Sequence, residues 1–142
     1  MLACYPVDAV GLAAYELWRD VLQEGHAEAR WTLGHARALR WYRQHAAAYV
    51  LELATERAEA HQPIAGAAVL YDREMQALQE LEEVCRSAAE KAQPGGSAGE
   101  EGDAPRLSGA PAQRAADLVG AALAAEREAV ARIGEALVAL GG

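Results

Sequence analysis

Hydrophobic residues recur three and four positions apart over most of the chain, which is the spacing of one face of an α-helix. This pattern predicts three long amphipathic helices, over residues of about 8–60, 64–92 and 112–140. Each helix would have one apolar and one charged face, so each must bury a face against another element. We therefore expect an all-α protein, with residues 1–142 forming a single helical domain in which three helices pack as a coiled-coil-like bundle.

The expected helix ends coincide with residues that start or interrupt helices. Asp8, which follows Pro6, is a good N-cap for the first helix. Pro63 ends that helix, because the residue before a proline is driven out of the helical region. Gly25 is a plausible break within it. Residues 94–111, rich in Gly, Pro and acidic side chains, predict a flexible linker between the second and third helices.

The stretch WTLGHARALRWYRQHAAAY, residues 31–49, contains two of the three Trp, two of the four His and no acidic residue. On a helix its residues separate into two faces. The first face is expected to form a helix seam, packed inside the bundle or serving as a polar functional surface. The seam consists of Trp31, His35, Tyr42, Tyr49 and Leu53.

The second face is expected to be an exposed, partner-binding face, because arginines beside an exposed Trp are typical of interface hot spots. We call it the arginine face, and it consists of Arg30, Arg37, Arg40 and Trp41. An alternative remains open, in which the arginines pair with glutamates of the second helix. The candidate glutamates are Glu74, Glu80, Glu82 and Glu83.

The composition narrows the classes of partner. Hydrophobic residues make up 52% of the chain, but Phe is absent, so Trp and Tyr must carry much of the burial. The net charge of −8 argues against nucleic acid or an anionic membrane as partner. Two Cys are too few for a disulfide framework, which favours the cytoplasm or another reducing compartment. We expect no signal peptide and no transmembrane segment.

The motifs of catalytic and metal sites are missing from the sequence. A di-metal site in a helical bundle uses Glu-x-x-His pairs, and the sequence contains none. Glu28 and His35 are seven residues apart and could share a helix face, but further ligands are lacking. There is no Gly-rich phosphate loop either. We therefore assign no catalytic, cofactor-binding or metal-binding residue, and we expect that the protein is not an enzyme.

A short repeat resembles a known family. The sequence Ala-Ala-Tyr occurs at residues 13–15 and again at 47–49, a lag of 34 residues that resembles the tetratricopeptide repeat. The resemblance implies a helical-repeat module that binds peptides. The sequence departs from the motif at Arg37, where the family has a tyrosine, and no glycine-bearing turn separates Arg37 from Tyr42. A repeat would need a helix break near Arg40.

The sequence thus favours a non-enzymatic structural or adaptor subunit that presents helical faces for self-association or for assembly into a larger complex. The expected partner is another protein or a second copy of the chain, and no small-molecule substrate is indicated. A tetratricopeptide-like peptide-binding module is the alternative. An enzyme or a metal-binding helical bundle is the third possibility.

Overall fold

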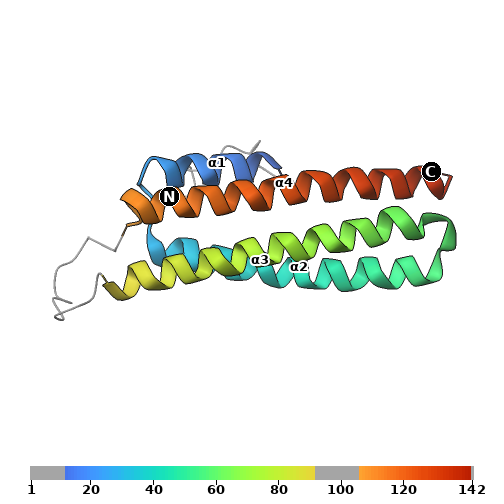
Figure 1. Cartoon of the computed structure of the whole chain (residues 1–142), viewed down its shortest axis with the longest axis horizontal. Coiled ribbons are helices and arrows are strands. Elements are labelled where there is room, and N and C mark those ends of the chain that lie inside the picture. The colour runs from blue at the N-terminus through green and yellow to red at the C-terminus, as the bar shows by residue number, and fades with distance from the viewer. Residues whose placement is uncertain (1–11, 92–105, 142) are drawn as a thin grey trace, which may run out of the picture.

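The computed structural model of the chain describes residues 12–91 and 106–141, apart from the side chain of Glu59. These residues are almost entirely helical, and no strand is present among them. In chain order the elements are α1 (Leu12–Gln23), α2 (Ala29–Glu56), the short 3₁₀ helix η1 (Ala58–Ala60), α3 (His61–Lys91) and α4 (Gly109–Ala139) (Figure 1). The all-α class is confirmed.

The expected first helix is in fact two helices, so the described residues hold four α-helices rather than three. The break lies at the predicted glycine. Gly25 has a φ of +75°, a left-handed conformation that glycine adopts at little cost. α1 ends two residues before it and α2 begins at Ala29. The turn lets the chain reverse direction.

The next chain reversal also differs from the expectation in detail. The first helix was expected to end at about residue 60, just before Pro63, but α2 ends at Glu56, η1 follows, and α3 begins at His61. Pro63 therefore lies in the first turn of α3. A proline is tolerated there because the first N–H groups of a helix have no intrahelical partner.

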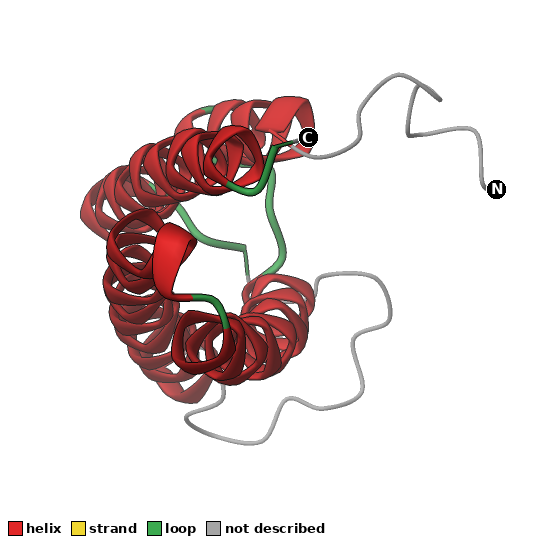
Figure 2. Ribbon diagram, turned by 90° about the vertical axis from the view of Figure 1, so that its right-hand side faces the viewer, coloured by secondary structure: helices red, strands yellow, loops and turns green. Residues whose placement is uncertain are grey.

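The four α-helices form an open arrangement. α2 lies beside α3, α3 beside α4, and α4 beside α1, whereas the backbones of α1 and α2 do not adjoin (Figures 1 and 2). α1 has 12 residues, or about 18 Å, and α4 has 31, or about 46 Å. The described part of α1 therefore accompanies one half of α4. Along the other half, the described residues provide three helices, α2, α3 and α4.

The core is divided in the same way. Where α1 lies, a first cluster brings together large side chains, including Trp18, Leu22, Leu78, Leu81 and Leu123. Beyond α1, a second cluster is formed by α2, α3 and α4, with Val50, Ile64, Leu70 and Tyr71 as its largest members. Alanines fill much of both clusters. Their small size lets neighbouring helices approach closely.

The packing of α2 corrects the predicted seam. The side that α2 buries is composed mainly of small residues: Ala29, Thr32, Ala36, Ala47, Val50 and Ala54. Trp31, Tyr42 and Tyr49 are 43%, 60% and 62% exposed, and His35 is also exposed. Of the predicted seam only Leu53 packs against a core cluster. The prediction of an internal seam is therefore wrong for four of its five residues.

The expected linker at 94–111 is also corrected at its C-terminal end. Leu107 is fully buried, and its N–H donates a hydrogen bond of 2.8 Å to the carbonyl oxygen of Ala27. α4 begins at Gly109, two residues before the predicted end of the linker. Residues 94–105 of the expected linker lie outside the described residues. The segment that enters α4 is thus fixed against the turn between α1 and α2.

A tetratricopeptide-like repeat would need a helix break near Arg40. α2 is instead a continuous helix from Ala29 to Glu56, so it runs unbroken through Arg40. None of the helices in the described residues is long and apolar enough to cross a membrane.

Candidate functional site

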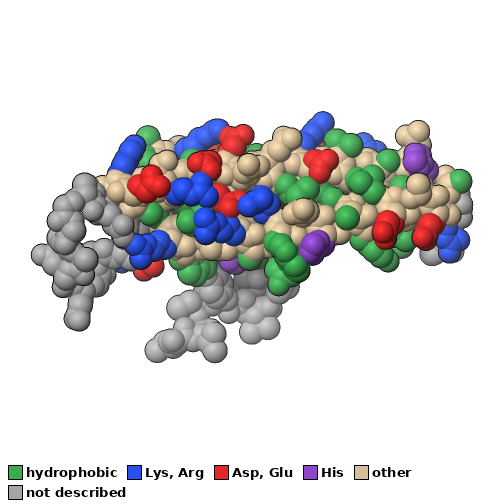
Figure 3. Space-filling model, turned by 90° about the horizontal axis from the view of Figure 1, so that it is seen from below, with side chains coloured by type: hydrophobic (Ala, Val, Ile, Leu, Met, Phe, Trp, Pro, Cys, Tyr) green, Lys and Arg blue, Asp and Glu red, His purple; other side chains and the backbone are tan. Residues whose placement is uncertain are grey.

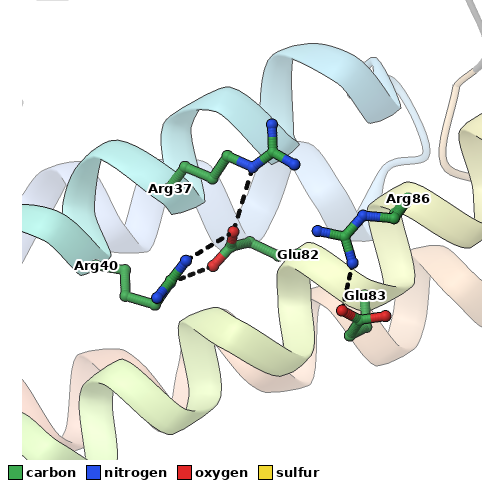
Figure 4. Close-up of polar contacts among 5 residues, drawn as sticks. All are labelled: Arg37, Arg40, Glu82, Glu83 and Arg86. Atoms are coloured by element: carbon green, nitrogen blue, oxygen red, sulfur yellow. Dashed lines mark hydrogen bonds and ion pairs between the residues drawn. The ribbon is translucent and has the colours of Figure 1, made fainter.

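The arginine face is not a set of four unpaired side chains, because two of its arginines form ion pairs with α3. Arg37 and Arg40 both bind the carboxylate of Glu82, which is only 3% exposed (Figure 4). The Nε of Arg37 lies 3.3 Å from Oε1 of Glu82, and Arg40 contacts both carboxylate oxygens. The alternative in which the arginines pair with glutamates of the second helix is thereby confirmed for this pair. Arg30 and Trp41 are exposed, Trp41 at 53%.

The next arginine along α2, Arg43, was not among the predicted site residues. It lies in a buried set of polar side chains that we call the polar cluster: Tyr15, Arg43, Glu74 and Glu126. Each member comes from a different one of the helices α1 to α4. The Nε of Arg43 lies 3.1 Å from Oε1 of Glu74 and 3.0 Å from Oε2 of Glu126. The hydroxyl of Tyr15 donates a hydrogen bond to Oε1 of Glu74.

The charges of the polar cluster do not balance if both carboxyl groups are ionised, since one guanidinium then faces two carboxylates. Burial, together with a hydrogen bond between the two carboxyl groups, raises the pKa of Glu74 to about 8. Oε2 of Glu74 receives no hydrogen bond from the described residues, and Oε2 of Glu126 has the ion-pair contact with Arg43 but no aligned hydrogen bond. A proton shared between them would satisfy both atoms and make the cluster neutral.

The other two members of the polar cluster keep their protons. Burial and the neighbouring charge of Glu74 raise the pKa of Tyr15, so its hydroxyl stays protonated. Burial alone would lower the pKa of Arg43, but the charges of Glu74 and Glu126 raise it, so the guanidinium stays charged. Three members of the cluster are buried, with Tyr15, Glu74 and Glu126 at most 8% exposed, whereas the side chain of Arg43 is 23% exposed. Its geometry ties four helices together rather than presenting a reactive group.

The sequence does contain a signal for the polar cluster. Glu74 stands in the apolar stripe of its helix, between Tyr71 and Leu78, and Glu126 stands between Leu123 and Val130. An acidic residue at such a position is buried with the stripe, and a buried carboxylate requires a partner. The sequence spacing does not show which arginine pairs with the buried carboxylate, because this depends on how α2 packs against α3.

The outward side of α2 carries a continuous set of exposed residues that we call the aromatic stripe. Its members are Trp31, His35, Ala38, Tyr42, His45 and Tyr49, all exposed. The steps between them are four, three, four, three and four residues, the spacing of a coiled-coil contact line. Four of the five predicted seam residues belong to this stripe. The periodicity was therefore detected correctly, and its side of the helix was not.

Ring contacts order the side chains of the aromatic stripe. The ring of His35 stacks on Trp31 at 5.1 Å and meets the edge of Trp18 of α1 at 4.9 Å. The two ring contacts partly bury His35, and this burial lowers the pKa of its imidazole. Trp41 makes edge contacts with Tyr42 and His45. On the face drawn in Figure 3, basic and acidic side chains interleave and hydrophobic side chains are exposed beside them.

Among the described residues, no group of three or more His, Cys, Asp and Glu side chains is placed to hold a metal ion. Comparison of the chain with models of known protein families, with curated proteins and with solved structures found no match.

The pairing of Arg37 makes a testable difference within the arginine face. Arg37→Glu places a carboxylate beside the buried carboxylate of Glu82, and we expect it to lower the free energy of unfolding by about 1 kcal/mol or more. Trp41→Ala removes an exposed ring and should change that free energy by less than about 0.5 kcal/mol. Urea denaturation followed by circular dichroism measures both. Equal stability of the two variants would contradict the pairing.

Proposed function

We propose that the protein is a non-enzymatic structural or adaptor subunit, which associates with another helix along the aromatic stripe of α2. The observation that carries this proposal is the exposure of all six coiled-coil-spaced positions of the stripe. A helix with an apolar line at this spacing normally buries it against a partner helix. Exposed apolar side chains that form a continuous patch mark sites of association.

The charges support a helical protein partner over an anionic one. Arg37, Arg40 and Arg43 are each engaged by glutamates of the same chain. The stretch of α2 that seemed basic therefore offers little free positive charge to a nucleic acid or a membrane surface. Tyr and Trp, which are enriched in the centres of protein interfaces, are exposed on its surface.

The test compares assemblies formed by matched variants. Tyr42→Glu combined with Tyr49→Glu places two charges on the aromatic stripe without touching the core. Leu51→Glu is the control, because Leu51 is 53% exposed on the same helix but on another side. Each affinity-tagged protein would be purified from the cells that make it, and the mass of its complex measured by native mass spectrometry.

We expect the stripe variant to lose the complex that the natural chain and the Leu51→Glu control retain. All three proteins should have the same helical circular dichroism spectrum. If the stripe variant keeps the complex, or if the natural chain forms none, the proposed function is wrong.

A further inference from the structure

We propose that the partner of the aromatic stripe is a second copy of this chain, whose α2 packs antiparallel to the first about a two-fold axis near residue 40. This inference rests on the proposed function and names the partner for its surface. Three features carry it: the order of residues in the stripe, the charges beside the stripe, and the apolar surface that the described residues leave exposed.

The order of residues makes the stripe complementary to itself when it is reversed. About a centre at residue 40, Trp31 lies beside Tyr49 of the second copy, His35 beside His45, and Ala38 beside Tyr42. The smallest residue of the stripe thus faces a large ring at the centre. Large aromatic pairs close both ends. Such alternation of small and large side chains is how two helices interdigitate.

The charges beside the stripe favour the antiparallel direction. Arg30 lies at one end of α2 and Glu52 near the other, both exposed and both along the same edge of the stripe. An antiparallel pair about residue 40 places Glu52 of each copy opposite position 28 of the other, where it meets Glu28 and, two residues farther along, Arg30, which can pair with it. A parallel pair would place Arg30 against Arg30 and Glu52 against Glu52, which is repulsive.

The described residues leave room on the same side of α2, beyond the described part of α1. Trp18 of α1 reaches His35, and α1 begins at Leu12, so no described helix covers Tyr42 and Tyr49 from that side. On α4, Val130 and Leu137 are 49% and 58% exposed in the half that α1 does not accompany. An antiparallel second copy brings its own α1 toward this open half.

The expected affinity follows from the area available. Trp31, Tyr42 and Tyr49 together leave roughly 300 Å² of side-chain surface exposed, given about 200 Å² for each aromatic residue. With the smaller members of the stripe and the open half of α4, each copy would bury roughly 500–600 Å². This lies at the low end of specific interfaces and predicts a reversible dimer with a dissociation constant in roughly the micromolar range.

The first experiment measures mass against concentration. Sedimentation equilibrium of the purified chain should give a monomer–dimer equilibrium. Tyr42→Glu with Tyr49→Glu should weaken the dimer at least about tenfold, and the Leu51→Glu control should dimerise like the natural chain. A chain that stays monomeric up to about 100 µM would overturn the inference, as would a dimer that the stripe variant leaves intact.

The second experiment tests the direction by disulfide cross-linking. Cys85 is buried and its pKa is raised to about 12 by that burial, so only Cys4 needs replacement by Ser. In the antiparallel pair, Cys introduced at position 35 of one copy lies beside Cys introduced at position 45 of the other. Two copies of position 35 are then about 15 Å apart along the axis.

A mixture of His35→Cys and His45→Cys chains should therefore cross-link, and His35→Cys alone should not. Cross-linking of His35→Cys alone would contradict the antiparallel direction. The outcomes also separate this inference from the proposed function. If the complex isolated from cells depends on the stripe but contains a different protein, the function stands and the second copy is excluded.

Discussion

Replacing Arg43 with Met is expected to lower the free energy of unfolding by about 3–5 kcal/mol. Arg43 contacts both carboxyl groups of the polar cluster. Methionine keeps an apolar chain in the place of the aliphatic part of the arginine side chain and removes the guanidinium. Without the guanidinium, a carboxylate at Glu74 or Glu126 remains buried and uncompensated. Removing one partner of a buried ion pair costs far more than the pair contributes in net stability. Urea denaturation followed by circular dichroism at 222 nm measures the loss.

A second variant separates charge from simple loss of packing. Arg43→Met combined with Glu126→Gln removes one carboxylate together with the guanidinium, and Glu74 then remains as a neutral acid. We expect the double variant to recover about half of the lost stability or more. If it is as unstable as Arg43→Met alone, the imbalance of charge is not the cause. The surface comparison is Arg37→Met, which leaves Glu82 paired with Arg40 and should cost less than about 1 kcal/mol.

Stability is expected to fall as the pH rises from about 5 to about 8, and Glu74 is the group responsible. Its folded-state pKa of about 8 lies above the value of 4.5 for a free side chain, so the folded state holds the proton more tightly. The stabilisation is complete below pH 4.5 and is lost as the pH rises through 8. The slope from one such proton is at most about 1.4 kcal/mol per pH unit.

Glu74→Gln isolates this contribution. The amide oxygen can accept from Tyr15 and Arg43, and the amide N–H can donate to Glu126, so the contacts of the protonated acid are retained. The variant should lose the slope between pH 5 and 8 and be more stable than the natural chain at pH 8. Glu80→Gln is the control, because Glu80 is exposed and paired with Arg114 at the surface. A natural chain with the same pH profile as Glu74→Gln would contradict the shared proton.

The fold could be predicted from the sequence as far as local rules decide it. The apolar periodicity gave the helices, and Gly25 gave the position of the turn between α1 and α2, since its positive φ is a property of that residue. The count of three helices is not confirmed, because a glycine such as Gly25 can be either a break or a tolerated helix residue. The predicted start of the third helix was too late, because Gly and Pro near residue 109 favour a linker. The buried Leu107 fixes that segment by tertiary contacts, which the local sequence does not show.

The candidate sites were predicted less well, for a physical reason that α2 makes plain. α2 has two faces able to pack, one of aromatic residues and one of Ala, Thr and Val. Burial area alone favours the aromatic face as the internal one. The small face wins because it lets α3 approach closely and brings Arg40 and Arg43 to the glutamates of α3. That choice depends on residues more than 30 positions away, which periodicity within α2 does not contain.

The central claim is that the aromatic stripe of α2 is covered in the assembled protein. Hydroxyl-radical labelling read by mass spectrometry measures the solvent access of individual tyrosines in the native state. In the assembled form, Tyr42 and Tyr49 should be oxidised several-fold more slowly than in the natural chain diluted until it is monomeric, although each is about 60% exposed in the single chain. Leu51 should react equally in both states. Oxidation of Tyr42 and Tyr49 at the same rate in both states would contradict the claim.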